Sequence, residues 1–204
     1  MSATLSERTE TAFTLRPLGD KFGAEITGLD LRRPLDPATR DAVWAAFARH
    51  QLLCFRGQAL NPEQQIAFSE QFGPLERHTL RNRGAAHPFL HTVTNLGPDG
   101  KPSGRLANQL WHSDKSFRPE PCSATILHAV TLPPDGGDTC FADMYAAYEA
   151  LPDAEQAALA PLRVVHSWEL SLAKSGKQAS PEEIADAPPM THPLVRIHPE
   201  TGRK

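Results

Sequence analysis

The sequence predicts a mixed, mainly β fold, an antiparallel barrel or jelly roll with helices on its outside. Three observations support this class. Helical patterns are concentrated near the front of the chain, short strand-like runs fill the second half, and turns rich in proline and glycine separate those runs. The parallel strand–helix–strand alternation that a doubly wound sheet requires is absent from the pattern.

Two short strands are expected first, over 13–17 and 24–31. In the second, apolar Ala24 and Ile26 alternate with polar residues, which is the pattern of a half-buried strand. A short apolar run at 52–55 predicts a third strand that is buried on both faces.

Two helices begin at recognisable capping signals. Asp36 precedes a proline, so the aspartate is the expected N-cap and the proline the first helical residue. Asn61 precedes a proline in the same way, and Gly73 is expected to end that second helix.

Residues 74–105 show neither a helical nor a sustained strand pattern, because charges, glycine and proline dominate them. A long irregular stretch inside a compact domain is typical of an active-site lid or of disorder, and we expect the lid here. The 204 residues are expected to form a single domain.

The second half is expected to hold most of the strands. The predicted elements are strands over 110–117, 123–130, 137–142, 162–168 and 193–197, helices beginning at Asp143 and Pro152, a loop over 172–190 and a turn over 198–202.

Composition excludes several function classes. The net charge of −3 and the pI near 6.3 give no basic excess for binding nucleic acid. No stretch approaches the roughly 20 apolar residues that a membrane helix needs. Three scattered cysteines are too few for a disulfide framework or a cysteine-based zinc site, so a reducing, cytoplasmic setting is expected.

His112 and Asp114 are the strongest candidates for chemistry. Residues two apart in a strand point to the same side, so an imidazole and a carboxylate would converge on one point. These are two of the three ligands of the 2-His-1-carboxylate triad that holds Fe(II). The alternative is a surface histidine beside a solvated aspartate, because so short a motif also arises by chance.

A glycine-rich turn follows downstream, at 135–139. It ends at Thr139, whose hydroxyl could contact a carboxylate oxygen of a ligand, although the same residues also suit a simple hairpin turn. His128 alternates with apolar residues and is read as a hydrogen-bonded core histidine. His198 and Glu200 repeat the His-x-carboxylate spacing, but their proline-containing turn favours a structural role.

Several motifs in chain order resemble the TauD/TfdA family, the taurine dioxygenase and 2,4-dichlorophenoxyacetate dioxygenase group. The matching segments are 23–31, Phe55-Arg56-Gly57-Gln58, Phe72-Gly73-Pro74-Leu75, Trp111-His112-Ser113-Asp114, Gly136-Gly137-Asp138-Thr139, 192–196 and 198–204. The segments 107–112 and 141–144 lean toward the aryloxyalkanoate-degrading branch.

The resemblance implies a double-stranded β-helix (jelly roll) with flanking helices, and Fe(II) with 2-oxoglutarate as co-substrate. It makes His112 and Asp114 iron ligands and Thr139 a contact of the 2-oxoglutarate carboxylate. It places His78 and Asn108 where related enzymes contact substrate. Read without the family, His78 is equally a solvated loop histidine and Asn108 a turn residue.

The implied activity is hydroxylation of a small anionic substrate, of sulfonate or aryloxyalkanoate type, with O₂ consumed and succinate and CO₂ released. The implied partners are small molecules, neither nucleic acid nor membrane, and a homo-oligomer is compatible with the sequence. The rival function is a non-catalytic or inactive fragment of the same fold that acts at most as a binding protein.

The resemblance also implies residues that the 204 positions lack. The family's second iron-ligating histidine and its 2-oxoglutarate-binding arginine follow the turn at 198–202, where this sequence ends. We therefore expect the jelly roll to be incomplete at its C-terminal part and the chain to be a shortened copy of a longer enzyme.

Overall fold

The computed structural model describes residues 12–77, 87–97, 99–102, 110–174 and 176–204. The chain divides into two compact units. The first unit comprises Met1–Pro74, His128–Glu149 and His198–Arg203, and the second comprises Leu75–Leu127, Ala150–Ile197 and Lys204.

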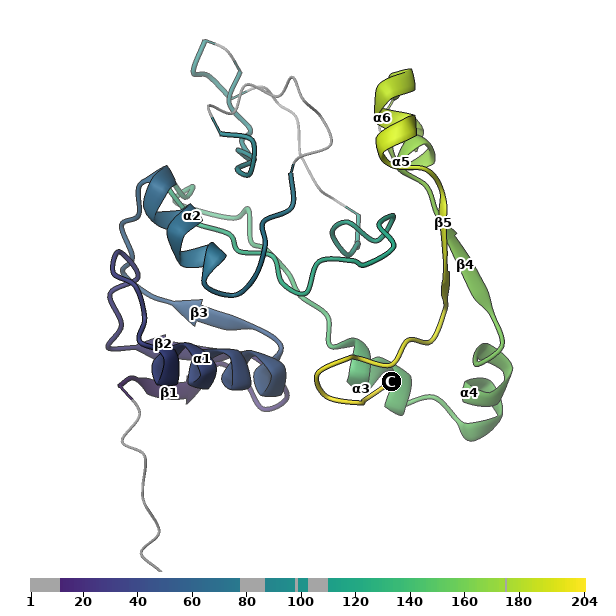
Figure 1. The fold of residues 1–204 in the computed structure, drawn as a ribbon, viewed down its shortest axis with the longest axis horizontal. Helices are drawn as coiled ribbons and strands as arrows, with labels where there is room; N and C mark the ends of the chain where they lie inside the picture. The colour runs from purple at the N-terminus through teal and green to yellow at the C-terminus, as the bar shows by residue number, and fades with distance from the viewer. Residues whose placement is uncertain (1–11, 78–86, 98, 103–109, 175) are drawn as a thin grey trace, which may run out of the picture. The chain divides into compact units, whose positions relative to one another are not determined.

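The first unit holds a three-stranded sheet, β1 (Thr14–Pro17), β2 (Ala24–Thr27) and β3 (Leu53–Phe55), in that spatial order (Figure 1). β1 and β2 pair antiparallel, as the short connection between them allows. β2 and β3 pair parallel, with helix α1 (Pro37–His50) as the crossover. The expected absence of any parallel strand–helix–strand unit is therefore wrong at this one place.

The predicted helix starts of the first unit are confirmed. The Asp36 carboxylate accepts a hydrogen bond from the Thr39 backbone N–H at 3.0 Å, which satisfies a free donor of the first turn of α1. Helix α2 (Pro62–Glu70) begins with a capping box between Asn61 and Gln64. The Asp143 side chain accepts from Ala146 N at 3.0 Å at the start of α3 (Met144–Glu149).

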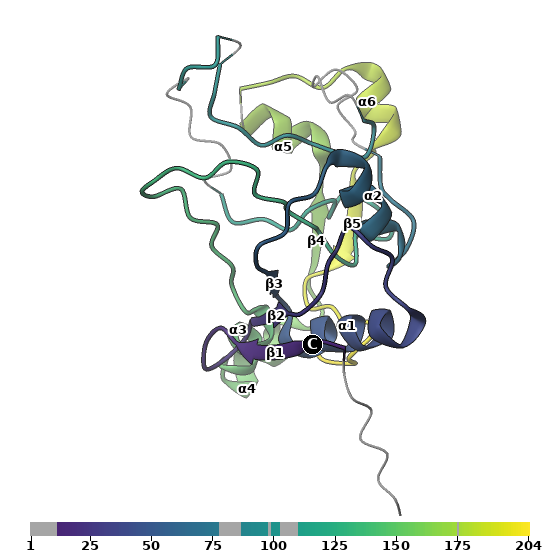
Figure 2. The ribbon, with the colours of Figure 1, turned by 90° about the vertical axis from the view of Figure 1, so that its left-hand side faces the viewer.

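The core of the first unit is formed between α1 and the sheet (Figure 2). Phe13, Ile26 and Val43 are buried at its centre. A series of aromatic rings extends the core: Phe68 of α2 contacts Phe55 of β3 at 5.8 Å and Phe72 at 5.2 Å, between ring centroids. Such offset and edge-on ring pairs add to the stabilisation that apolar burial supplies.

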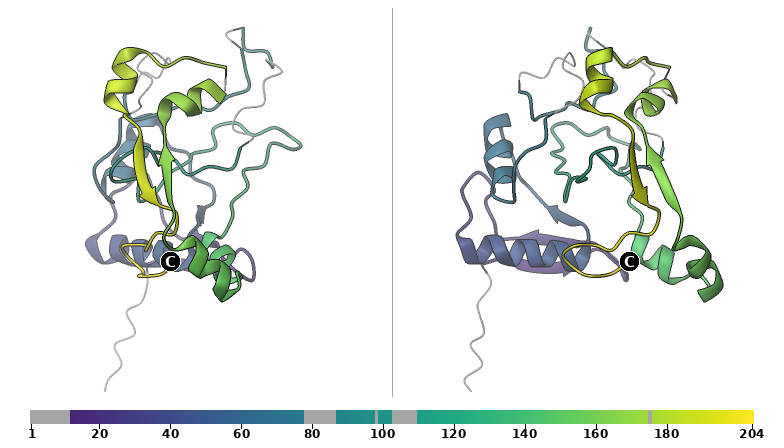
Figure 3. Two further views of the ribbon diagram at one scale, coloured as in Figure 1. Left: turned by 90° about the vertical axis from the view of Figure 1, so that its right-hand side faces the viewer. Right: turned by 45° about the vertical axis from the view of Figure 1, so that its right-hand side comes forward.

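The second unit contains a two-stranded antiparallel ribbon of β4 (Arg163–His166) and β5 (Met190–Pro193), shown in Figure 3. Helix α4 (Asp153–Leu159) precedes β4, and α5 (Trp168–Lys174) and α6 (Pro181–Asp186) lie between the two strands in sequence. The start of α4 and the strand at β4 agree with the predictions.

Three predictions for the second half are wrong. The expected loop over 172–190 contains the end of α5 and all of α6, which a capping box between Ser180 and Glu183 initiates. The last strand lies at Met190–Pro193 and not at 193–197, because its ladder with β4 pairs Val164 with His192.

The third wrong prediction is that of strands over 110–117, 123–130 and 137–142. None of the described residues in these ranges forms a strand. The physical reason is pairing: a strand needs a hydrogen-bonded neighbour, and the ladders in the described part of the chain join only β1 to β2, β2 to β3 and β4 to β5.

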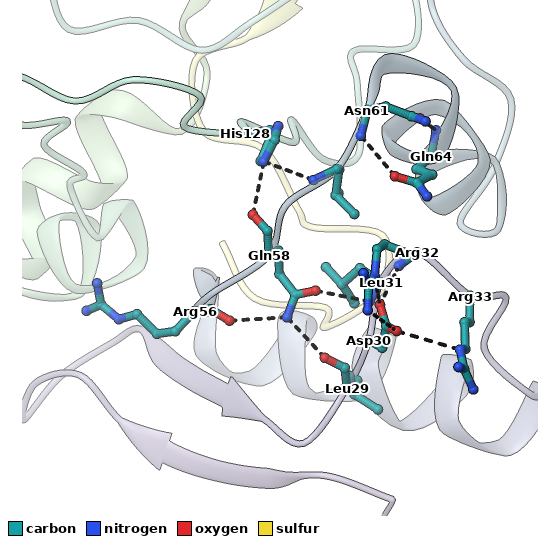
Figure 4. Close-up of polar contacts among 11 residues, drawn as sticks. Leu29, Asp30, Leu31, Arg32, Arg33, Arg56, Gln58, Asn61, Gln64 and His128 are labelled. Carbon is teal, nitrogen blue, oxygen red and sulfur yellow. Dashed lines mark hydrogen bonds and ion pairs between the residues drawn. The ribbon is translucent and has the colours of Figure 1, made fainter.

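Two of the recognisable motifs, 23–31 and 55–58, are joined by the side chain of Gln58 (Figure 4). Its Oε1 accepts from Leu31 N at 3.1 Å, and its Nε2 donates to Leu29 O at 3.0 Å and to Arg56 O at 3.1 Å. The backbone oxygen of Gln58 in turn lies 3.2 Å from Nε2 of His128, which confirms a hydrogen-bonded, structural role for that histidine.

We expect Gln58→Leu to lower the free energy of unfolding by about 1–3 kcal/mol, because the backbone groups at Leu29 and Leu31 would lose their partners in a half-buried place. Urea unfolding monitored by circular dichroism measures this. The matched control is Gln178→Leu, at an exposed position. Equal stabilities of the two variants would contradict the structural role of Gln58.

Candidate metal centre

His112 and Asp114 lie in a stretch of the second unit that is neither helix nor strand. Asp114 begins a turn, which closes where the Arg118 backbone N–H donates to Lys115 O at 2.9 Å. Lys115 has a φ of 54°, in the left-handed region that a non-glycine residue seldom adopts. The backbone reverses immediately after the aspartate and does not continue as the predicted strand.

The two side chains nevertheless converge. Nε2 of His112 lies 3.4 Å from Oδ1 of Asp114, and both side chains are about half exposed, at 52% and 47%. The sequence prediction that they face one point agrees with this contact, although the strand from which it was argued is not present in the described residues.

Each of the two side chains has its other polar atom occupied. Nδ1 of His112 lies 2.7 Å from Leu110 O. A carbonyl oxygen only accepts, so Nδ1 donates in this contact, and in the neutral imidazole Nε2 is then the nitrogen with the lone pair. On the carboxylate, Oδ2 of Asp114 accepts a hydrogen bond from the Thr125 hydroxyl at 2.9 Å.

This arrangement fits a metal ion. In the neutral ring with its hydrogen on Nδ1, the Nε2 lone pair and a carboxylate oxygen face each other, and these are two atoms that can bind one cation. Two ligand atoms at about 2.1 Å from one ion lie roughly 3.0–3.4 Å apart at right to tetrahedral angles, which agrees with the observed 3.4 Å. A histidine that donates its other ring N–H to a carbonyl is also typical of metal ligation.

The pair is short of a full ligand set within the described residues. Among residues 12–77, 87–97, 99–102, 110–174 and 176–204, no group of three histidine, cysteine or acidic side chains is placed to hold a metal ion. The described residues thus offer two ligands, one nitrogen and one oxygen, which is a donor set that suits a first-row transition metal.

Arg118 connects the segment that carries His112 and Asp114 to the rest of the second unit. Its Nε donates to the Glu76 carboxylate at 2.8 Å and its Nη2 to Asp186 Oδ2 at 2.9 Å. Lys115 lies 3.7 Å from the same Glu76 oxygen. Burial lowers the pKa of Lys115, while the nearby Glu76 carboxylate acts in the opposite direction.

The β4–β5 ribbon joins the same network. His192 is buried, and its Nε2 donates to the backbone oxygen of Arg118 at 2.9 Å. His166 lies next to it, with 5.5 Å between the ring centroids. Burial lowers the pKa of His166, and the nearby His192 and Arg196 lower it further.

Thr139 belongs to the first unit and is exposed. The turn before it requires glycine, because Gly136 and Gly137 have φ of 69° and 75° and a Cβ on Gly137 would lie 3.1 Å from Pro133. The predicted contact of Thr139 with a co-substrate stays a prediction.

His78 and Asn108 lie outside the described residues, and so does part of the expected lid. The described lid residues, 74–77, 87–97 and 99–102, contain no helix and only one isolated β-bridge, between Leu96 and Pro102. His198 accepts from Glu200 N at 3.2 Å within its turn, which agrees with the structural role predicted for that histidine.

A comparison with family models matches residues 14–204 to the family described as "Taurine catabolism dioxygenase TauD, TfdA family". The chain belongs to this family. The resemblance seen in the motifs is thereby confirmed, and with it membership of a group of α-ketoglutarate-dependent dioxygenases.

The chain spans about two thirds of the length of its TauD/TfdA relatives. It is 39% identical to an "Alpha-ketoglutarate-dependent 2,4-dichlorophenoxyacetate dioxygenase" of Cupriavidus pinatubonensis, over 92% of this chain and 70% of the relative. It is 33% identical to an "Alpha-ketoglutarate-dependent sulfate ester dioxygenase" of Pseudomonas putida, over 93% of this chain and 64% of the relative.

Solved structures of TauD/TfdA-like proteins have a similar fold. One is AAD-2 in complex with Mn(II) and N-oxalylglycine, with a TM-score of 0.67 and 34% identity over 94% of this chain and 67% of that one. Another is a taurine dioxygenase from Burkholderia xenovorans, with a TM-score of 0.73 and 34% identity over 94% and 61%. Within the described residues, no helix is long and apolar enough to cross a bilayer.

The lowered pKa of His166 predicts a dependence of stability on pH. The folded state binds fewer protons than the unfolded state, so the free energy of unfolding falls as the pH drops through and below about 6.5, the ordinary pKa of histidine. We expect His166→Gln to be less sensitive to acid between about pH 7 and 5. Urea unfolding across that range measures it, and an unchanged pH slope in the variant would contradict the prediction.

Proposed function

We propose that this protein is an Fe(II)- and 2-oxoglutarate-dependent dioxygenase that hydroxylates a small anionic substrate of aryloxyalkanoate or sulfonate type. The observation that carries the proposal is the facing of His112 Nε2 and Asp114 Oδ1 at 3.4 Å, with the other polar atom of each side chain already hydrogen bonded. The family and the names of the relatives support the choice of co-substrate.

In the proposed site, His112 and Asp114 hold the metal ion. Thr139 contacts the carboxylate of 2-oxoglutarate, and His78 and Asn108 contact the substrate. The bound metal supplies the coupling of O₂ reduction to oxidative decarboxylation of 2-oxoglutarate, which yields succinate and CO₂ and places one oxygen atom on the substrate. The site belongs to a jelly roll, and residues 74–105 act as its lid.

The choice of substrate class rests on the relatives and on chemistry. A hydroxyl group placed on carbon next to an ether oxygen or a sulfonate sulfur makes that C–O or C–S bond labile, so an alcohol, a phenol or sulfite leaves. Relatives that bear the names 2,4-dichlorophenoxyacetate and phenoxypropionate dioxygenase support an aryloxyalkanoate first. The reaction is proposed to take place in the cytoplasm.

The second candidate is a binding protein without catalysis, and the specific observation in its favour is the two-ligand set of the described residues. The two functions differ in turnover: the enzyme forms succinate in proportion to substrate consumed, whereas the binding protein forms none.

The test uses the purified protein, with any residues that follow Lys204 in its gene, loaded with Fe(II) and 2-oxoglutarate. We expect succinate to form in the presence of phenoxyalkanoates or alkyl sulfonates. His112→Ala and Asp114→Ala should each lower that rate by at least about 100-fold, since even the loss of a residue that only supports a metal ligand costs 10–100-fold.

The matched control is His198→Ala, which removes the histidine of the other His-x-carboxylate pair and should leave the rate within about 3-fold of the wild type. Full activity in His112→Ala would contradict the ligand assignment. Absence of succinate with every substrate of these classes would favour the binding protein.

A further inference from the structure

We infer that Thr125 is a positioning residue for the metal pair: its hydroxyl holds Asp114 so that a single carboxylate oxygen, Oδ1, faces His112. The inference rests on the proposed function, because it takes His112 and Asp114 as the metal-binding pair. It adds a residue that neither the motif spacing nor the comparisons assign.

The Asp114 carboxylate would be free to rotate without a hydrogen-bonded partner. The torsion that turns an aspartate carboxylate is broad and nearly two-fold, so an exposed carboxylate readily exchanges its two oxygens. The Asp114 side chain is about half exposed, which leaves it room to do so. The hydrogen bond from Thr125 Oγ1 to Oδ2, at 2.9 Å, selects one of the two orientations.

The Thr125 hydrogen bond also selects the carboxylate oxygen that can bind a metal ion. With Oδ2 engaged by a hydroxyl, Oδ1 is the oxygen left for a metal ion, and it is the atom that lies 3.4 Å from His112 Nε2. One carboxylate oxygen beside one imidazole nitrogen suits a transition metal, whereas Ca²⁺ favours many oxygens and carboxylates that bind through both.

A positioning role for Thr125 differs from a purely structural one in its effect on folding stability. Thr125 and Asp114 are exposed and eleven residues apart in sequence. A hydrogen bond between exposed groups adds little to folding stability because water competes for both partners. Loss of the Thr125 hydroxyl should therefore change metal affinity while leaving the unfolding midpoint nearly unchanged.

The pairing of the two residues is also supported by how His112 is held. Leu110 O orients the imidazole through Nδ1 and Thr125 orients the carboxylate through Oδ2, so each ligand is supported on the side away from the other. Such outer partners typically change metal affinity by 10–100-fold.

The experiment measures the dissociation constant of Co(II), and separately of Mn(II), by isothermal titration calorimetry on the whole protein. We expect Thr125→Val, which removes the hydroxyl at nearly constant volume, to bind each ion about 10-fold more weakly. Thr125→Ser keeps the hydroxyl and should stay within about 3-fold of wild type. Thermal unfolding of every variant is followed in parallel.

Two further variants make the outcomes distinguishable. Thr131→Val, at an exposed threonine of the other unit, should bind like wild type. If Thr125→Val binds like wild type while His112→Ala does not bind, the role of Thr125 is overturned and the metal pair stands. If His112→Ala binds like wild type, or the wild type binds neither ion, the metal pair and the role of Thr125 are both overturned.

Discussion

The guanidinium of Arg118 ties the segment that carries His112 and Asp114, the proposed metal pair, to the rest of the second unit. This side chain is only 19% exposed and meets two carboxylates, those of Glu76 and Asp186. A cation at such a place needs its partners, because removal of one leaves charge without compensation. The backbone N–H of Arg118 also closes the turn that follows Asp114, so the residue whose side chain joins distant segments of the second unit lies in the same turn as the aspartate.

Hydrogen bonds from single groups do, at this site, what a sheet ladder does elsewhere in the chain. In β4 and β5, regular pairing sets the direction of each side chain. Around His112 the described chain has no ladder, and three contacts orient the pair: Leu110 O on the imidazole, Thr125 on the carboxylate and the closed turn at Arg118. Because each contact is a single hydrogen bond between different groups, each can be altered by one substitution or one backbone change.

Features that depend on contacts between neighbours in sequence could be predicted from the sequence, and features that depend on distant pairing could not. The helices at Asp36 and Asn61 were predictable because a cap is a contact between neighbours in sequence. Ser180 carries the same signal, with proline next and Glu183 three residues on, so α6 could also have been found. The prediction of strands over 110–117, 123–130 and 137–142 failed because an alternating pattern indicates a strand but does not show which segment would pair with it.

For the proposed metal pair, His112 and Asp114, the sequence likewise predicts the residues but not the contacts of their individual atoms. Spacing and family resemblance pick out His112 and Asp114, but they leave open which ring nitrogen and which carboxylate oxygen face each other. The Leu110 carbonyl decides which ring nitrogen faces Asp114: it accepts a hydrogen bond from Nδ1, which leaves Nε2 on the side of the aspartate. Thr125 decides the second, through a contact across eleven residues that no spacing rule contains. If the proposed metal pair binds its ion, these supporting groups specify the site as much as the two ligands do.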